Sequence, residues 1–288
     1  NTAVGSLSLR RNVSGSGNTA IGRESLHENT SGSNNVAVGK LALYTTTSGE
    51  NTAVGTEALR LNTSGDKNTS IGFESLYSNT SAGNNTAVGF QAGYSTNNSA
   101  ATFNTLLGYQ AGYSNLSGST NTFIGPYSGY SMTTGSNNTF VGRYNGNQGG
   151  LDLRTSSNNI VLSDGAGNVR LIVNSSGNVG IGTSSPSQQL HISGTDNKIL
   201  VESTDYAALQ LKSGSTRTFN IQSINDSSGA LRIYDATADV ERMRIDSSGN
   251  VGIGTTNPFT KFHAKDTGWS SGAPYGSVSL IEGNNVND

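Results

Sequence analysis

Short apolar segments recur along the first half of the chain inside a fixed polar frame. The segment reads Asn-Thr-Ala-Val-Gly or a close variant, and copies of it begin at Asn1, Asn18, Asn35, Asn51, Asn68, Asn85, Asn104, Asn121 and Asn138. Successive copies lie 17 residues apart, except for one interval of 16 and one of 19. Because a strand rises roughly 3.3 Å per residue and the chain must return, so short a unit holds about two strands and two turns. The pattern predicts a β-solenoid or β-roll of about nine coils.

Two neighbouring positions of each repeat are apolar and lie on opposite faces of the predicted strand. The third position is Ala or Ser in six repeats and then becomes Leu106, Phe123 and Phe140. The fourth position is always aliphatic, and we expect it to face the inside of the coil: Val4, Ile21, Val38, Val54, Ile71, Val88, Leu107, Ile124 and Val141. A strand that is apolar on both faces is buried on both. We therefore expect the third position to meet other copies of the chain in a homotrimer.

A second apolar position exchanges volume with the third. It holds Leu9, Leu26, Leu43, Leu59 and Leu76 and then Gly93, Gly112, Gly129 and Gly146. Leu precedes a small third residue in the next repeat, and Gly93 precedes the large Leu106. Since close-packed interiors tolerate mainly volume-conserving changes, the two positions are predicted to share one site between adjacent coils.

The recurring Asn and Gly residues are interpreted as backbone devices. Gly supplies positive φ, and Asn bonds locally in turns. The Asn-Thr-Ser-Gly segments at 29–32 and 62–65 predict the opposite turn of the coil, and they are also glycosylation sequons.

A different pattern follows the repeats. The segments SSGNVGIGTSSPSQQLHI and SSGNVGIGTTNPFTKFHA begin at Ser175 and Ser247, 72 residues apart. Further strands are predicted at 169–173, 198–202, 208–212, 218–224, 231–234 and 243–245, with turns at 164–165 and 228–229. We expect four regions: a β-roll (1–147), a connector with the first GNVGIGT module (148–194), a small antiparallel β-sandwich (195–246), and the second module with an irregular end (247–288). His191 and His263 hold equivalent places, which favours packing over catalysis.

Composition removes several functional classes. The chain has no Cys, 17 Lys and Arg against 19 Asp and Glu, and a formal net charge of −2. No basic cluster is present, so no nucleic-acid partner is expected. No apolar run reaches the roughly 18 residues needed to span a membrane. No motif for calcium, zinc or a cofactor occurs, so none is expected.

The repeats resemble the head repeats of trimeric autotransporter adhesins, which form a left-handed parallel β-roll from somewhat shorter units. The GNVGIGT segments are similar to those of phage tail fibres that end in an intramolecular chaperone of the endosialidase type. These resemblances imply an all-β homotrimer with interwoven fibre segments, located on a virion tail or extracellular surface. In that family the chaperone assembles the trimer and cuts itself off, and no chaperone-like region is visible here.

The function expected from this reasoning is a structural and receptor-binding fibre segment, without enzymatic activity, that attaches to surface polysaccharide or another envelope receptor. A phage tail fibre is favoured, with a bacterial adhesin as the alternative. The candidate receptor contacts are the repeat-equivalent tyrosines, whose flat apolar body and polar tip suit sugars, although covering the edge of the core explains them too: Tyr44, Tyr77, Tyr94, Tyr113 and Tyr130.

Two other classes remain open from sequence. A polysaccharide-cleaving tailspike needs paired carboxylates, and Glu57 and Glu74 hold equivalent places in adjacent repeats. Ice or mineral binding needs a regular polar array, which the threonines of the second position offer, with Val36 as an interruption: Thr2, Thr19, Thr52, Thr69, Thr86, Thr105, Thr122 and Thr139.

Overall fold

The computed structural model describes residues 1–97, 102–195, 198–204, 206–213, 217–224 and 229–265. These residues contain strands and turns but no helix, so the expected all-β class is confirmed for them. The chain forms two compact units, Asn1–Asn197 and Lys198–Asp288. Each unit is described by itself below.

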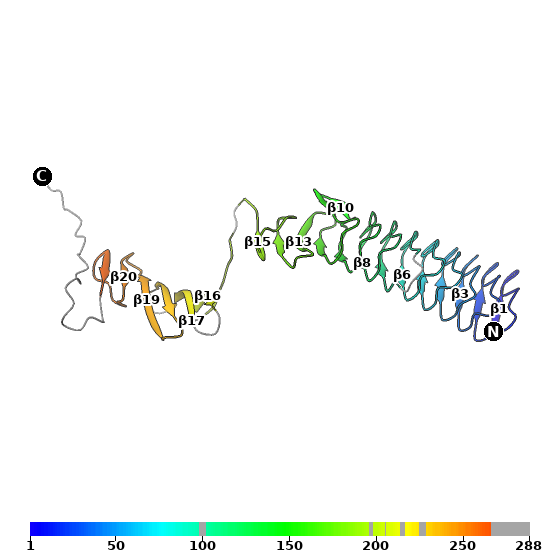
Figure 1. The fold of residues 1–288 in the computed structure, drawn as a ribbon, viewed down its shortest axis with the longest axis horizontal. Helices are drawn as coiled ribbons and strands as arrows, with labels where there is room; N and C mark the ends of the chain where they lie inside the picture. Colours follow the sequence, from blue (N-terminus) through cyan, green and yellow to red (C-terminus); the bar gives the residue numbers. More distant parts are fainter. Residues whose placement is uncertain (98–101, 196–197, 205, 214–216, 225–228, 266–288) are drawn as a thin grey trace. The chain divides into compact units, whose positions relative to one another are not determined.

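The first unit is a β-solenoid whose coils are stacked by nine short parallel strands (Figure 1). Each strand pairs in register with the next, as Thr2, Ala3 and Val4 do with Thr19, Ala20 and Ile21. The strands are β1 (Thr2–Val4), β2 (Thr19–Ile21), β3 (Val36–Val38), β4 (Thr52–Val54), β5 (Thr69–Ile71), β6 (Thr86–Val88), β7 (Thr105–Leu107), β8 (Thr122–Ile124) and β9 (Thr139–Val141). The predicted solenoid of about nine coils is thus confirmed.

The second strand expected in each coil is absent from the described residues. The segment after each motif is a series of turns, because its alternate residues have left-handed backbones, such as Glu57 (φ 60°) and Leu59 (φ 50°). Its amides still bond between coils: Leu59 N donates to Ser75 O at 3.0 Å, and Glu57 N donates to Lys40 O at 2.9 Å. Stacking therefore satisfies the backbone without a regular strand.

The inward and outward faces of the strands are the reverse of the sequence expectation. The third position is fully buried in coils two to nine: Ala20, Ala37, Ala53, Ser70, Ala87, Leu106, Phe123 and Phe140. The fourth position is exposed or half-buried, as in Val4 (57% exposed) and Leu107 (45% exposed). The physical reason is the narrowness of the coil, which accepts Ala beside Leu but has no room for a second aliphatic row. The fourth position is the outer surface of the solenoid.

The predicted volume exchange operates inside the coil. A Cβ built on Gly93 would lie 2.7 Å from Leu106 Cδ1 and 2.9 Å from Leu76 Cδ2. The space beside Gly129 is filled by the ring of Phe123 from its own coil, and Phe123 stacks on Phe140 with centroids 4.9 Å apart. Large third residues therefore fill the space left by Gly.

A buried asparagine ladder fixes the stacking of the coils. In each case Oδ1 accepts from the backbone N of the next motif asparagine, at 2.8 Å from Asn18 to Asn1 and at 3.0 Å from Asn159 to Asn138. The same side chains donate from Nδ2 to a turn carbonyl, as Asn18 does to Gly32 O at 2.8 Å. Asn29 and Asn62, the sequon asparagines, are also fully buried in such bonds, so their amides are closed to a glycan.

The fifth position requires glycine at every coil. Gly39 has φ +136°, a region essentially confined to glycine, and a Cβ there would lie 2.5 Å from Gly55 O. The adjacent coils can therefore approach closely only because neither residue has a side chain.

The strand stack continues beyond the ninth repeat. β12 (Ile160–Ser163) pairs in parallel with β9, and β13 (Val169–Val173), β14 (Val179–Ile181) and β15 (Leu190–Ile192) follow it in a 13-stranded sheet. A small hairpin of β10 (Asn147–Gln148) and β11 (Leu151–Asp152) forms its own sheet. The sheet thus joins the nine repeats to the first GNVGIGT module.

The second unit is one six-stranded sheet. Its strands follow chain order: β16 (Tyr206–Ser213), β17 (Arg217–Ile224), β18 (Leu231–Asp235), β19 (Val240–Ile245), β20 (Val251–Ile253) and β21 (Phe262–Ala264). The described residues provide no second layer, so the expected sandwich is not seen there. The segment 198–202 is not a strand, since Ile199 and Leu200 are largely exposed and find no strand to pair with. The predicted turn at 228–229 lies partly outside the described residues. Residues 266–288 of the predicted irregular end lie wholly outside them.

The two GNVGIGT copies fold alike. In each, an antiparallel strand precedes the Val-Gly-Ile strand and a parallel strand follows it: β13, β14 and β15 in one, and β19, β20 and β21 in the other. His191 pairs with Gly180, and His263 pairs with Gly252. The turn at the start of each copy is held by one side chain. Asn174 Oδ1 accepts from the backbone N of Ser176 and of Asn178. Asp246 Oδ1 accepts in the same way from the backbone N of Ser248 and of Asn250.

Candidate functional site

The candidate tyrosines form a stacked column on the turn side of the solenoid. Tyr77, Tyr94, Tyr113 and Tyr130 stack in sequence, and each neighbouring pair has ring centroids 5.1 Å apart. All four are half-buried, so each ring keeps an accessible edge. The structure brings these four together as their repeat spacing predicts.

Tyr44 belongs to a separate pair. It stacks on His27 of the preceding coil, with ring centroids 5.1 Å apart. The equivalent residue of the next coil is Arg60, so the stack of rings does not continue from Tyr44 to Tyr77. The Arg60 guanidinium lies 5.7 Å from the centroid of Tyr77 and donates to its hydroxyl at 3.1 Å. The column therefore begins with Arg60 over Tyr77 and continues through Tyr130.

The carboxylates considered for polysaccharide cleavage have other partners. Glu57 accepts from Arg60 at 2.9 Å, and Glu74 accepts from Gln91 Nε2 at 2.7 Å. Gln110 Nε2 continues this row by donating to Gln91 Oε1 at 2.7 Å. The row reads as a hydrogen-bonded ladder of repeat-equivalent side chains, and the absence of enzymatic activity stays a prediction.

A second aromatic column was missed by the sequence reasoning. Phe73, Phe90 and Tyr109 stack with centroids 5.3 and 5.1 Å apart, and each is about two-fifths exposed. These residues occupy the sixth position of consecutive repeats, directly after the motif glycine, and that repeated aromatic character was the available signal. The pKa of the Tyr109 hydroxyl is raised, first by its partial burial and then by the neighbouring Tyr127 hydroxyl.

The two columns meet at Tyr127 in the eighth coil. Its ring contacts Tyr109 edge-on at 5.2 Å and Tyr130 edge-on at 5.8 Å. Arg143 lies over the Tyr127 ring, with its guanidinium carbon 5.3 Å from the centroid. These side chains line a cavity of about 280 Å³ together with Asn145, Gln148 and Ala166.

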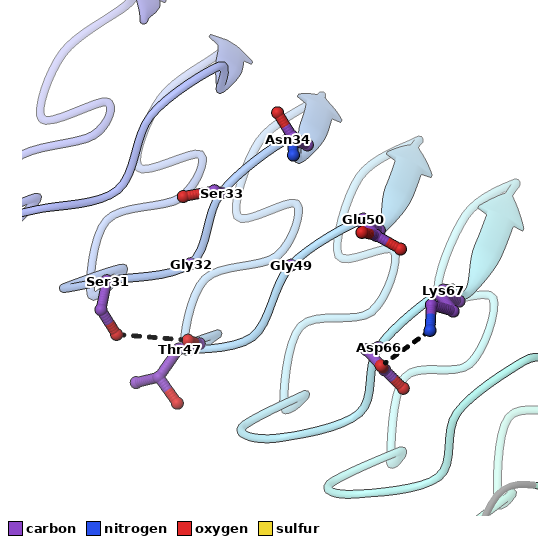
Figure 2. A pocket seen from close by; sticks show the side chains of 9 residues that line it. All are labelled: Ser31, Gly32, Ser33, Asn34, Thr47, Gly49, Glu50, Asp66 and Lys67. Carbon is purple, nitrogen blue, oxygen red and sulfur yellow. Dashed lines mark hydrogen bonds and ion pairs between the residues drawn. The ribbon is translucent and has the colours of Figure 1, made fainter.

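Another cavity lies on the loops of coils two to four, where the one 16-residue repeat shortens the turn (Figure 2). Figure 2 shows its hydroxyls, glycines and charged side chains on successive coils. Lys67 Nζ lies 3.7 Å from Asp66 Oδ2, so the two form an ion pair. Glu50 occupies the coil before them. None of the described residues that line this second cavity is aromatic, so they offer no stacking platform for a sugar.

A long exposed apolar feature is the outer row of the solenoid sheet. One aliphatic residue per strand lies on this face over all 13 strands, none of them fully buried: Val4, Ile21, Val38, Val54, Ile71, Val88, Leu107, Ile124, Val141, Leu162, Leu171, Ile181 and Ile192. The threonines of the second position share this face, because residues two apart in a strand point the same way. Contiguous exposed apolar surface of this kind marks an interaction site.

The second unit also leaves an apolar face uncovered. The paired residues Leu209, Ile221 and Ile233 are 57%, 39% and 36% exposed. Leu211, Leu231, Ile253 and Phe262 extend this face by alternation and register. The opposite face buries polar side chains such as Gln222, which accepts from Arg232 at 2.7 Å. Within the described residues of this unit, the sheet therefore buries polar side chains on one face and exposes apolar side chains on the other, with no covering layer.

Chemical and sequence comparisons add little further. Among the described residues, no group of three His, Asp or Glu side chains is arranged to hold a metal ion. No membrane-spanning helix occurs in that part of the chain. The sequence matches no protein-family model and no curated protein.

Proposed function

We propose that this chain is a structural and receptor-binding segment of an extracellular homotrimeric fibre, most simply a phage tail fibre that attaches to a host cell surface. The observation that carries the proposal is the aliphatic outer row, which one chain leaves exposed on every strand of its longer sheet. Soluble monomers seldom keep a contiguous apolar surface of this extent. Two further copies of the same chain would cover it.

The second unit supports the same arrangement. The outer residues Leu171 and Ile181 of the first GNVGIGT copy correspond to Met243 and Ile253 of the second, and Ile253 lies on the uncovered apolar face. One mode of association between chains therefore accounts for both exposed faces. Interwoven GNVGIGT strands are part of the proposal, because Ile181 and Ile253 on these strands are 41% and 43% exposed in the single chain.

The receptor-binding half of the proposal rests on the aromatic columns. Tyr77, Tyr94, Tyr113 and Tyr130 supply a continuous row of half-buried ring edges with phenolic hydroxyls, which suits saccharides of a cell envelope. A bacterial surface adhesin would use the same surfaces, and the genes beside the coding sequence distinguish the two settings.

Analytical ultracentrifugation of the whole chain tests the assembly, with three times the monomer mass as the expected result. Adsorption of labelled protein to cells with intact and with enzymatically stripped surface polysaccharide tests the attachment. A folded monomer, or equal adsorption to both cell preparations, would contradict the respective half of the proposal.

Ice binding is a second candidate that one observation favours. The threonine row, with Val36 in the third coil, and the aliphatic row lie side by side on the outer sheet face, in register over nine coils. This is a regular array of hydroxyl and methyl groups. Thermal hysteresis of a purified solution tests it, and its absence leaves the outer face to chain association.

A further inference from the structure

The cavity at the meeting point of the two aromatic columns has a composition unlike the rest of the solenoid surface. Tyr127 and Tyr130 come from the eighth coil, Arg143 and Asn145 from the ninth, and Gln148 from the side hairpin. Gln148 Nε2 donates to Ala166 O at 2.7 Å, which joins the hairpin to the turn between β12 and β13 and closes one wall. The pocket thus forms where the repeat pattern ends.

The lining combines two stacking platforms with a cation. The rings of Tyr127 and Tyr130 stand edge to face at 66°, so they present two differently oriented apolar surfaces. Arg143 is exposed and stacks on Tyr127, and it has no acidic partner at ion-pair distance among the described residues. An arginine in this state presents its planar donors to a ligand.

Acidic side chains are missing from the lining. The seventh repeat position, which is Glu57 and Glu74 in the fourth and fifth coils, is Gln91, Gln110 and then Tyr127 toward this end. Among the described residues that line the cavity there is no Asp or Glu. The local field at Arg143 therefore favours an anion over a cation.

We propose that this cavity is a binding subsite for one acidic sugar residue of a surface glycan, with a carboxylate that faces Arg143 and a ring that stacks on Tyr127 and Tyr130. Planar guanidinium groups bind carboxylates through two parallel hydrogen bonds, and amide side chains such as Asn145 fix sugar hydroxyls. The volume of about 280 Å³ is close to the lower end of the range of about 300 to 1,000 Å³ usual for ligand pockets, which suits one ring.

The inference deepens the proposed receptor-binding function and depends on it for its biological setting. The tyrosine column leads from the cavity along the coils, so that neutral sugars of the same glycan would lie along the exposed edges of Tyr113 and Tyr94, whose faces are stacked on neighbouring rings. The acidic subsite then sets the position of the glycan along the column.

The test uses the whole chain and four monosaccharides: glucuronate, galacturonate, glucose and galactose. Saturation-transfer NMR and calorimetric titration are expected to show binding of at least one uronate at least tenfold tighter than its neutral counterpart. Arg143→Gln is expected to remove this preference, and Tyr130→Ala to weaken binding of both the acidic and the neutral sugar.

Arg23→Gln is the matched control, because Arg23 holds the same repeat position as Arg143 but is followed by Glu24 instead of an aromatic residue. It is expected to bind like the unchanged protein. Equal binding of uronates and neutral sugars, no binding of any, or an unchanged preference in Arg143→Gln would overturn the subsite. Sedimentation and cell adsorption are measured on the same samples, so a failure of the subsite with normal assembly and adsorption is distinguishable from a failure of the fibre proposal.

Discussion

Leu106 occupies the space that a side chain on Gly93 would need, since a Cβ built there would lie 2.7 Å from Leu106 Cδ1. Gly93→Leu is therefore expected to overpack the coil and destabilise the protein by about 1 to 3 kcal/mol per chain. The backbone adds little to this cost, because the equivalent Leu76 already has φ 48°. Denaturant unfolding measures the change.

The double variant Gly93→Leu with Leu106→Ala is the control for this reasoning. It recreates the combination of a Leu with a small third residue in the next repeat, as in the fully buried Leu59 and Ser70, so most of the lost stability should return. A double variant less stable than either single variant would show that the two positions do not share one space.

Asn68 makes bonds on both sides of its coil. Its backbone N donates to Asn51 Oδ1 at 3.0 Å, its Oδ1 accepts from Asn85 N at 3.0 Å, and its Nδ2 donates to Ala82 O at 2.9 Å. Asn68→Ala leaves buried polar groups without partners, and a loss of about 1 to 3 kcal/mol is expected. The exposed Ser14→Ala is the control and should change the unfolding free energy by less than about 0.5 kcal/mol. Equal effects of the two variants would deny the ladder its stabilising role.

The repeat frame was predictable from sequence because every device in it is local and recurs. Asn, Gly and the exchange between Leu106 and Gly93 each impose a backbone or volume requirement that the 17-residue spacing makes visible. The prediction of which strand face lies inside the coil was wrong, because the alternation of residues identifies two faces without saying which one is inside. The exchange itself contained the answer: a third residue that trades volume with an interior glycine must also be interior.

The candidate site was only partly predictable. The column of Tyr77, Tyr94, Tyr113 and Tyr130 follows from repeat spacing, but Tyr127 falls outside any repeated aromatic position, and Arg143 follows the last motif. Their contact depends on how the eighth and ninth coils stack where the side hairpin leaves the solenoid. Sequence periodicity cannot describe a place where the period ends.

Asp235 gives the second unit a dependence on pH. Its carboxylate accepts from Arg242 and Arg217, each at 2.8 Å, and these bonds hold the Asp235 pKa well below its ordinary value. A carboxyl whose folded pKa is depressed contributes stability that is complete above its unfolded pKa of about 3.9 and is lost as pH falls toward the folded value. Amides of β17 to β19 should therefore exchange faster below about pH 4 than the pH dependence of intrinsic exchange explains.

Asp235→Asn should remove this acid-dependent change and should exchange faster at pH 7, since two arginines lose their partner. Hydrogen exchange read by mass spectrometry on peptides of the second unit measures both effects, and Glu202→Gln, which alters an exposed carboxylate of the same unit, is the control. An acid-dependent opening that persists in Asp235→Asn would assign the effect to another group.

Phe123 and Ile124 are neighbours on β8 with opposite surroundings, and this pair separates the folding of a coil from the association of chains. Phe123 is fully buried inside the coil, whereas Ile124 is 36% exposed on the outer row. Phe123→Asp places a carboxylate in the core and should unfold the coil whether or not chains associate.

Ile124→Asp should leave the interior of each coil intact but weaken a homotrimer three times per particle, since each chain loses an aliphatic contact worth about 1.5 to 3 kcal/mol when buried. Because stability is linked to association, the expected results are a lower Tm, a stronger dependence of Tm on protein concentration, and dissociation on dilution in the ultracentrifuge. Leu116→Asp is the matched control: it changes an aliphatic residue that is 53% exposed, but on a turn instead of the outer row, and it should keep the three-chain mass. If Ile124→Asp kept the mass and Tm of the unchanged protein, the outer row would not be the surface that joins the chains, and the exposed apolar sheet faces would need another partner.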